Sequence, residues 1–337
     1  MPPGVRHTVA SVLIVFASSQ TAHALVAGIP AAARAAHHAA HDGRITACDV
    51  LVPGGWTPDA LCHAEFARLV PGLAIRGVGN RERTYEREVR GEFPDGDAAL
   101  GPEAALAQWD RAVLAATAKP TDGIVSRHIN RPVSRAVSRR LLRVPWVRPI
   151  HATYVNMALA VAMTACLLLG GAWGAIAGAL LFQAASMFDG VDGEIARATF
   201  RTSARGATLD SLTDAATNFA FIGGLAANLW LRGLESAAYA GLAGLVMLML
   251  GTALLGLTAR RSGKGVNFDA VKARFLARGT LAAKVVTWIT MRDFIAAAAV
   301  VLVLAGLAAA ALWTFAAIVA AWLVVVLATL ARGFATR

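Results

Sequence analysis

The chain has 337 residues, of which 57% are hydrophobic and 16% are charged, and its formal net charge is +11. Because soluble domains carry about 25% charged residues, this composition excludes an ordinary soluble protein and indicates several membrane-spanning helices. The three cysteines, Cys48, Cys62 and Cys166, are an odd number and therefore indicate no disulfide framework.

The first third of the chain has the pattern of a small α/β domain. Apolar runs over 11–16 and 47–52 predict two buried strands, and an Ala-rich stretch over 30–41 predicts a helix between them. Strand, helix and strand at this spacing favour a parallel sheet. We therefore expect residues 1–118 to form a domain of their own.

An alternative interpretation of the first 25 residues is a secretory signal. Arg6 precedes an apolar stretch that ends in a small-x-small sequence at 22–24. Cleavage there would leave the following domain outside the membrane, and the basic segment at 127–148 would then approach the first span from the wrong side. The charge distribution of the later loops contradicts that arrangement, so we favour a cytoplasmic domain.

Residues 119–149 form a basic segment directly before the first long apolar stretch. Its arginines alternate with Ile, Val and Leu at helical spacing, which predicts an amphipathic helix lying in the membrane interface against anionic lipid head groups. The alternative is a solvated linker helix whose arginines only set the topology. No nucleic-acid partner is expected, because the arginines stand immediately before a span.

Residues 150–337 contain six stretches that are apolar and long enough to cross a membrane. They lie at 151–170, 172–190, 207–231, 236–258, 290–310 and 312–331. Lys and Arg gather before the first stretch, between the second and third, and between the fourth and fifth. The positive-inside rule then places both termini on the cytoplasmic side. We expect a mainly α, polytopic membrane protein with six transmembrane helices and a small N-terminal α/β cytoplasmic domain.

Four aspartates stand at fixed intervals within this apolar part. They are Asp189, Asp192, Asp210 and Asp214, in the pattern D-x2-D-G-x2-A-R-x8-G-x3-D-x3-D. A carboxylate at the bilayer centre costs at least ~2.5–3.5 kcal/mol, and converging carboxylates repel one another unless cations neutralise them. Oxygen ligands without nearby His or Cys favour Mg2+ or Mn2+ over Zn2+. The pattern therefore predicts a site for two metal ions that serves displacement at a diphosphate.

The pattern resembles the signature of the CDP-alcohol phosphotransferases. Members of that family are six-helix membrane enzymes that displace CMP from a CDP-linked donor with an acceptor alcohol. By this resemblance Asp189, Asp192 and Asp210 would hold the metals. Asp214 would complete the metal site and act as the general base on the acceptor hydroxyl. The family also implies a homodimer and an active site on the cytoplasmic side.

The residues between the aspartates are suited to a phosphate ligand. Gly193, Ala196 and Gly206 are small enough for a ligand to lie against the backbone, and Arg197 can meet a negative charge. The resemblance implies that these four residues line the site for cytidine diphosphate.

Other passages are similar to a branch of the family that fuses an N-terminal nucleotidyltransferase domain to the membrane domain and makes inositol-phosphate phosphodiesters. These passages are 119–132, 292–294, and 26–30 with the Ala-rich helix that follows. Nucleotidyltransferases need a Gly-rich loop ending in Arg or Lys after their first strand. Here that loop, 16–21, has neither glycine nor a basic residue. We infer a degenerate domain that has lost cytidylyl transfer.

The acceptor alcohol must be recognised by residues beyond the aspartates. Arg260, Lys284 and Arg292 are candidates to bind the phosphate of a phosphorylated polyol, such as an inositol phosphate. The donor is either CDP-diacylglycerol or a CDP-polyol. The Ala- and Arg-rich composition is typical of a bacterial gene, so the expected location is the bacterial inner membrane.

Two other functions are compatible with intramembrane aspartates. A cation transporter would not need Gly193, Ala196, Arg197 and Gly206 at their positions. A catalytically inactive membrane scaffold would be expected to have lost at least one aspartate, and all four are present. The sequence therefore favours a transferase over both.

Overall fold

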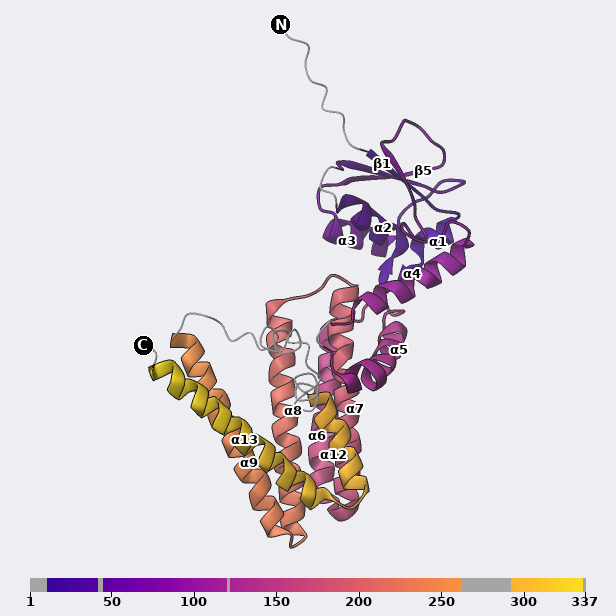
Figure 1. Cartoon of the computed structure of the whole chain (residues 1–337). Helices are drawn as coiled ribbons and strands as arrows, with labels where there is room; N and C mark the ends of the chain where they lie inside the picture. Colours follow the sequence, from indigo (N-terminus) through magenta and orange to yellow (C-terminus); the bar gives the residue numbers. More distant parts are fainter. Residues whose placement is uncertain (1–10, 42–44, 120–121, 262–291, 336–337) are drawn as a thin grey trace. The chain divides into compact units, whose positions relative to one another are not determined.

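The computed structural model describes residues 11–41, 45–119, 122–261 and 292–335 (Figure 1). The chain separates into two compact units. The amino-terminal unit consists of Met1–Ala118, Arg135–Arg148 and Glu194–Arg201. The helical unit consists of Lys119–Ser134, Pro149–Gly193 and Thr202–Arg337. The domain boundaries proposed above, 1–118, 119–149 and 150–337, stay a prediction.

The amino-terminal unit is built on a parallel sheet with the strand order β5-β4-β1-β6. Its strands are β1 (Ser11–Val15), β4 (Ala47–Leu51), β5 (Ala74–Val78) and β6 (Arg87–Arg90). Its other elements are α1 (Ser19–His23), β2 (Leu25–Val26), β3 (Ile29–Pro30), α2 (Ala31–Ala40), α3 (Ala60–Leu69) and α4 (Pro102–Ala116). The two strands and the helix predicted from the apolar runs are confirmed, as is the parallel pairing of β1 with β4.

The core of this unit lies between the sheet and α2. Ala32, Ala35 and Ala36 of α2 are fully buried and belong to one cluster with Ile14 and Val50 of the sheet. Because alanine is small and has the best helix propensity, this stretch forms a helix that approaches the strands closely. The central strand β1 reads as an almost continuous apolar run, as is typical of a buried strand in a parallel sheet.

A buried carboxylate interrupts the apolar run of β4. Asp49 is fully buried and accepts hydrogen bonds from Arg76 at 2.9 Å and from the Tyr85 hydroxyl at 2.7 Å. Arg83 lies 3.1 Å from the same carboxylate. Burial alone would raise the pKa of Asp49, but the hydrogen bonds from Arg76 and Tyr85 outweigh it and the pKa is lowered. Asp49 therefore stays charged within the fold at neutral pH.

The helical unit contains the long apolar helices. Its helices are η1 (Ser126–Asn130), α6 (Pro149–Leu169), α7 (Gly171–Ala198), α8 (Ala204–Leu231), α9 (Glu235–Arg261), α12 (Arg292–Leu304) and α13 (Ala308–Ala335), with the last turn of α7 grouped in the other unit. Among the described residues, four segments are long and apolar enough to cross a membrane, namely Pro149–Leu169, Gly171–Ala198, Glu235–Leu257 and Ala308–Ala328. A multi-pass, mainly helical protein with a small N-terminal α/β part is therefore confirmed, whereas the number six stays a prediction.

Two predicted spans differ from the other four in length or polarity. The helix α8 has 28 residues, about 42 Å at 1.5 Å per residue, but Asp210 and Asp214 make it more polar. The helix α12 is apolar but has only 13 residues. These two features explain why α8 and α12 are not among the four.

The turn between α6 and α7 is tight and contains glycines at 170, 171 and 174. Gly171 has a φ of +54°, and a side chain at Gly174 would come within 2.1 Å of the Cys166 carbonyl oxygen. From α8, the buried Asn228 donates hydrogen bonds to the carbonyl oxygens of Leu167 at 2.7 Å and Gly171 at 2.8 Å. The Asn228 amide thus joins the hairpin of α6 and α7 to α8.

The basic segment before α6 is helical over 124–141, and its role as an amphipathic juxtamembrane helix stays a prediction. It consists of the π-helical η1 followed by α5 (Arg131–Leu141). Arg131 is buried in an ion pair with Asp122 at 2.8 Å, and Ser134 is buried as well, whereas Ile129 and Val133 are exposed. A buried arginine needs a carboxylate partner, and Asp122 supplies it for Arg131. Contact with lipid head groups stays a prediction.

Candidate metal centre

Three of the four aspartates come together in the helical unit. Asp189 of α7 and Asp210 and Asp214 of α8 each offer one carboxylate oxygen, and these oxygens all lie within 4.8 Å of one another. The two helices lie side by side, since the rings of Phe182 and Phe221 stack between them at 4.1 Å. All three side chains are partly buried.

The local sequence accounts for this convergence. Ser203 begins α8 as its N-cap by accepting a hydrogen bond from the Gly206 N–H at 3.0 Å. In the helix that follows, Asp210 and Asp214 are four residues apart and thus share a face. On α7 the helix continues past Asp189 to Ala198, so the aspartate lies within regular helix rather than at its end.

Asp192, the fourth aspartate, is oriented toward α6. Its Oδ2 accepts a hydrogen bond from the hydroxyl of Thr153 at 2.8 Å, and Thr153 is only 6% exposed. Asp192 is not part of the three-residue group, and its role as a metal ligand stays a prediction. The sequence analysis missed Thr153, which stands as one hydroxyl in a largely apolar helix and gives no signal of its own.

Gly190 allows close packing beside the aspartates. A methyl group at this position would lie 2.9 Å from the Arg131 Nη1 and 3.2 Å from the Ser134 Oγ. The chain before α6 therefore approaches α7 closely at Gly190, a position without a side chain. Asn130, the neighbour of Arg131, adds hydrogen bonds to Ser186 of α7.

The chemistry of the three-aspartate group fits a hard divalent cation. Like charges at such short separations repel one another in a partly buried site. Oxygen ligands of Mg2+ lie about 2.0–2.1 Å from the metal, so two ligands of one ion are about 3–4 Å apart. The separations of up to 4.8 Å are near that range. Zinc sites, by contrast, are usually built with His or Cys.

Two of the four residues predicted to line the cytidine diphosphate site make hydrogen bonds within the amino-terminal unit. In the amino-terminal unit, Arg197 Nε donates to the Thr117 carbonyl oxygen at 2.9 Å, and the Ala196 carbonyl oxygen accepts from Arg201 N–H at 2.8 Å. In the helical unit, Gly206 is exposed in the first turn of α8. Their role, with that of Gly193, stays a prediction.

The predicted acceptor residues lie only in part within the described structure. Lys284 lies outside the described residues. Arg260 belongs to the last turn of α9, and Arg292 is the first residue of α12. Next to it, Asp293 accepts a hydrogen bond from the Ser126 N–H at 2.6 Å, which joins α12 to η1.

An apolar groove of about 660 Å³ runs between α6 and α8. Among its lining residues are Met157 and Leu168 of α6 and Leu209 and Leu212 of α8. Thr213, the neighbour of Asp214 in the sequence, also lines it. The groove therefore begins one residue away from the carboxylate group and offers an apolar surface to a ligand.

A second group with metal-ligand chemistry lies in the amino-terminal unit. One ligand atom each of His23, Asp59 and Cys62 lies within 4.8 Å of the others. Asp59 is the N-cap of α3, accepting from the Cys62 N–H at 2.7 Å, and His23 Nδ1 lies 2.8 Å from the Ser19 carbonyl oxygen. Burial raises the pKa of the Cys62 thiol to about 12. These hydrogen bonds account for the positions of Asp59, as the N-cap of α3, and of His23.

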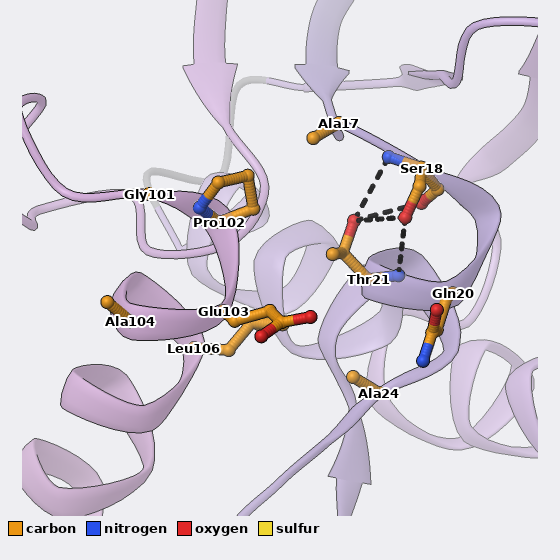
Figure 2. A pocket seen from close by; sticks show the side chains of 10 residues that line it. All are labelled: Ala17, Ser18, Gln20, Thr21, Ala24, Gly101, Pro102, Glu103, Ala104 and Leu106. Carbon is orange, nitrogen blue, oxygen red and sulfur yellow. Dashed lines mark hydrogen bonds between the residues drawn. The ribbon is translucent and has the colours of Figure 1, made fainter.

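A cavity of about 700 Å³ follows β1 in the amino-terminal unit (Figure 2). It is lined by Ser18, Gln20 and Thr21 on one side and by Pro102 and Glu103 of α4 on the other. In a nucleotide-binding α/β fold, the loop after the first strand is where backbone N–H groups meet phosphate.

Side chains of the unit itself already occupy the donors of this loop. The Ala17 N–H donates to Glu92 Oε1 at 2.6 Å, and Thr21 Oγ1 donates to the same oxygen at 3.2 Å. Ser18 and Thr21 form a capping box in which each side chain accepts from the backbone of the other (Figure 2). Glu92 is 3% exposed. The buried Glu92 carboxylate therefore already accepts two donors of the loop after β1.

Comparison with known proteins gives one family match. Residues 146–292 match the model of the family described as CDP-alcohol phosphatidyltransferase. The match agrees with the family predicted from the aspartate pattern and includes all four aspartates.

Several curated relatives carry the name "Bifunctional IPC transferase and DIPP synthase". One, from Rubrobacter xylanophilus, is 39% identical over 174 residues, which are 50% of this chain and 39% of the relative. The relative from Aquifex aeolicus is 40% identical over 108 residues, covering 32% of this chain and 24% of the relative. That from Thermococcus kodakarensis is 42% identical over 107 residues, 31% of this chain and 23% of the relative. The matches thus span well under half of each relative, and they agree with the predicted branch.

Proposed function

We propose that this chain, whose residues 146–292 match the CDP-alcohol phosphatidyltransferase family, transfers a substituted phosphate group from a CDP-linked donor to an acceptor alcohol and releases CMP. The meeting of Asp189, Asp210 and Asp214 carries the proposal, because their carboxylate oxygens lie within 4.8 Å of one another on two neighbouring helices. The family and the names of the relatives support a CDP-alcohol phosphotransferase.

The aspartates would have distinct tasks. Asp189, Asp192 and Asp210, with Asp214, would hold two Mg2+ or Mn2+ ions, which neutralise the diphosphate and improve CMP as a leaving group. Asp214 would also accept the proton of the acceptor hydroxyl. The acceptor oxygen then forms a bond to the β-phosphorus, and the bond from that phosphorus to the bridging oxygen breaks. CMP leaves with the bridging oxygen, and the product is a phosphodiester.

The acceptor that we propose is a polyol phosphate such as an inositol phosphate. The resemblance of 119–132 and 292–294 to the branch that makes inositol-phosphate phosphodiesters supports this choice. Arg260, Lys284 and Arg292 would bind the acceptor phosphate. For the donor, the apolar groove between α6 and α8 favours CDP-diacylglycerol, because acyl chains need such a surface, whereas the relatives favour a CDP-polyol.

The proposed setting is the bacterial inner membrane. Six spans, with α8 and α12 added to the four apolar segments, would place both termini and the aspartates at the cytoplasmic side. The basic residues before α6 would face anionic lipid. A homodimer is the expected assembly, as in the family.

The amino-terminal unit would no longer transfer cytidylyl groups. Glu92 supports this, because its buried carboxylate accepts the Ala17 N–H and would repel a nucleotide phosphate brought to the same place. The unit is therefore proposed as a degenerate nucleotidyltransferase-like domain. The absence of a basic residue from 16–21 supports the same conclusion.

The experiment is CMP release by the purified full chain in detergent with Mg2+. CDP-diacylglycerol and CDP-inositol are offered in turn, each with a panel of polyols and polyol phosphates. Asp214→Asn and a reaction with chelator are the controls. The proposal expects release that needs one donor–acceptor pair, the metal and Asp214. Release that persists in Asp214→Asn would contradict the role of that residue, and metal-driven ion flux in vesicles without any release would favour the transporter.

A further inference from the structure

We infer that Arg34 and Arg68 of the amino-terminal unit are positioning residues for the reaction, because they hold the carboxyl end of α7, the helix that carries Asp189 and Asp192. This inference rests on the proposed function of the aspartates. It assigns a task to a domain in which Glu92 accepts the Ala17 N–H of the loop after β1.

Arg34 binds the last carbonyl group of α7. Its Nη2 donates to the Ala198 carbonyl oxygen at 2.6 Å, and Nε donates to the Val26 carbonyl oxygen at 3.0 Å. The last carbonyl groups of a helix have no partner within the helix, and the end carries partial negative charge. Arg34 therefore donates a hydrogen bond to the last carbonyl group of α7 and joins this helix end to the hairpin of β2 and β3.

Removing the Arg34 guanidinium from water has an unfavourable free energy. Arg34 is 4% exposed, and burial lowers the pKa of its guanidinium to about 10. A buried cation is unfavourable unless its hydrogen bonds are made. A simple packing residue at this position of the Ala-rich α2 would avoid that cost. The arginine is better explained by the carbonyl groups that it holds.

Arg68 binds the two residues that follow α7. Its Nη2 donates to the Thr199 carbonyl oxygen at 2.9 Å, and Nη1 donates to the Phe200 carbonyl oxygen at 3.3 Å. Glu65, buried on the same helix α3, pairs with both Arg68 and Arg201. Three consecutive carbonyl groups, from 198 to 200, are thus held by two arginines.

Phe200 shows that the path of the chain here is specific. Its φ is +53°, in the left-handed region that residues other than glycine rarely adopt. Its ring lies 5.3 Å from the Arg34 guanidinium and 4.4 Å from the His37 ring. These contacts offset an unfavourable backbone conformation.

The held segment joins the two helices that carry the ligands. Ala198 lies six residues after Asp192, about 9 Å along α7. Only residues 199–203 separate α7 from α8, where Asp210 and Asp214 stand. If this connection were loose, the two pairs of aspartates would be presented to metal and diphosphate in a wider range of arrangements. Holding it should therefore raise metal affinity and turnover together.

The test compares Arg34→Met, Arg34→Lys and Arg68→Met with the unchanged full chain. The metal dependence of CMP release gives the half-saturating Mg2+ concentration, and electron paramagnetic resonance gives Mn2+ affinity without turnover. We expect Arg34→Met to weaken Mn2+ binding and raise half-saturating Mg2+ about tenfold. Arg34→Lys, which keeps a donor and a charge, should recover part of the affinity.

Arg76→Met is the matched control in the same domain. It removes an arginine whose described contacts are with Asp49, so it weakens the unit without touching α7. Equal loss of Mn2+ affinity in Arg34→Met and Arg76→Met would overturn the inference and leave a general folding role. If Arg34→Met does not fold, Phe200→Gly keeps the backbone conformation and removes the ring contacts, and it should weaken Mn2+ binding severalfold. Unchanged affinity in both Phe200→Gly and Arg68→Met would also overturn it.

The Mn2+ measurement separates this inference from the proposed function. Wild-type protein that binds Mn2+ but releases no CMP contradicts the proposed transfer, while a weakened affinity in Arg34→Met still supports positioning. Release that depends on the aspartates, with Mn2+ affinity unaffected by Arg34→Met, supports the transfer and overturns the positioning role.

Discussion

Thr153 of α6 donates a hydrogen bond to Asp192 of α7 across 2.8 Å, although the two residues are 39 positions apart in the sequence. The contact orients one carboxylate oxygen of Asp192 and joins α6 to the aspartate motif of α7. Hydrogen bonds to charged groups contribute about 1.5–3 kcal/mol, so this one is strong enough to decide the rotamer of Asp192.

Thr153→Val should therefore lower CMP release. The variant keeps the shape of the side chain and loses the hydroxyl, so Asp192 would sample orientations that do not serve the site. We expect kcat to fall about tenfold, which corresponds to about 1.4 kcal/mol. Thr153→Ser keeps the donor and should retain most of the activity. Steady-state kinetics with wild-type activity in Thr153→Val would contradict a role for this hydrogen bond.

Gly190→Ala should destabilise the helical unit. Alanine normally favours a helix over glycine by about 1 kcal/mol. Here the added methyl group would lie 2.9 Å from Arg131 Nη1, and overpacking costs about 1–3 kcal/mol. Gly223→Ala on α8 is the control, because no atom lies within 4 Å of its added methyl group. Thermal unfolding in detergent should show a lower midpoint for Gly190→Ala and a midpoint equal to or above wild type for Gly223→Ala.

Asn228→Asp should loosen the hairpin between α6 and α7. The carboxylate has the same size but donates no hydrogen bond, so the carbonyl groups of Leu167 and Gly171 would lose their donor. A buried polar group without its partner costs about 1–3 kcal/mol. The expected result is a lower unfolding midpoint and faster hydrogen exchange at the turn. Exchange as slow as in the wild type would show that the amide does not hold the hairpin.

Acid should destabilise the amino-terminal unit through Asp49. The pKa of this carboxyl in the folded chain is below its unfolded value of about 3.9. Its contribution to stability is therefore complete above that pH and is lost as the pH falls through the folded pKa. Unfolding midpoints measured as the pH is lowered from about 5 to about 2 should fall more steeply in the wild type than in Asp49→Asn. Parallel pH profiles would assign the acid sensitivity to other groups.

The elements of the fold were largely predictable from the sequence. The apolar run at 11–16 and the Ala-rich stretch at 30–41 show their period directly, because burial imposes it on each strand and helix. The spacing of Asp210 and Asp214 likewise predicts a shared helix face. Local pattern and local structure agree in these cases.

Contacts between distant residues were not predictable in the same way. Nothing in the sequence around Thr153 indicates Asp192, and nothing at Gly190 indicates Arg131. The basic segment shows the same limit, since Arg131 is buried by its partner Asp122 although arginine at that spacing predicts an exposed face. Partner choice depends on how helices pack, and hydrophobic periodicity does not encode it.

The central claim is that the aspartates form a metal site used in CMP displacement. The most direct test measures Mn2+ affinity and CMP release for Asp210→Asn and for its neighbour Ser211→Ala, an exposed residue whose hydroxyl donates to the Ala207 carbonyl oxygen at 2.9 Å. We expect Asp210→Asn to bind Mn2+ at least tenfold more weakly and to release almost no CMP, while Ser211→Ala stays close to wild type. Wild-type Mn2+ affinity and wild-type CMP release in Asp210→Asn would contradict the claim.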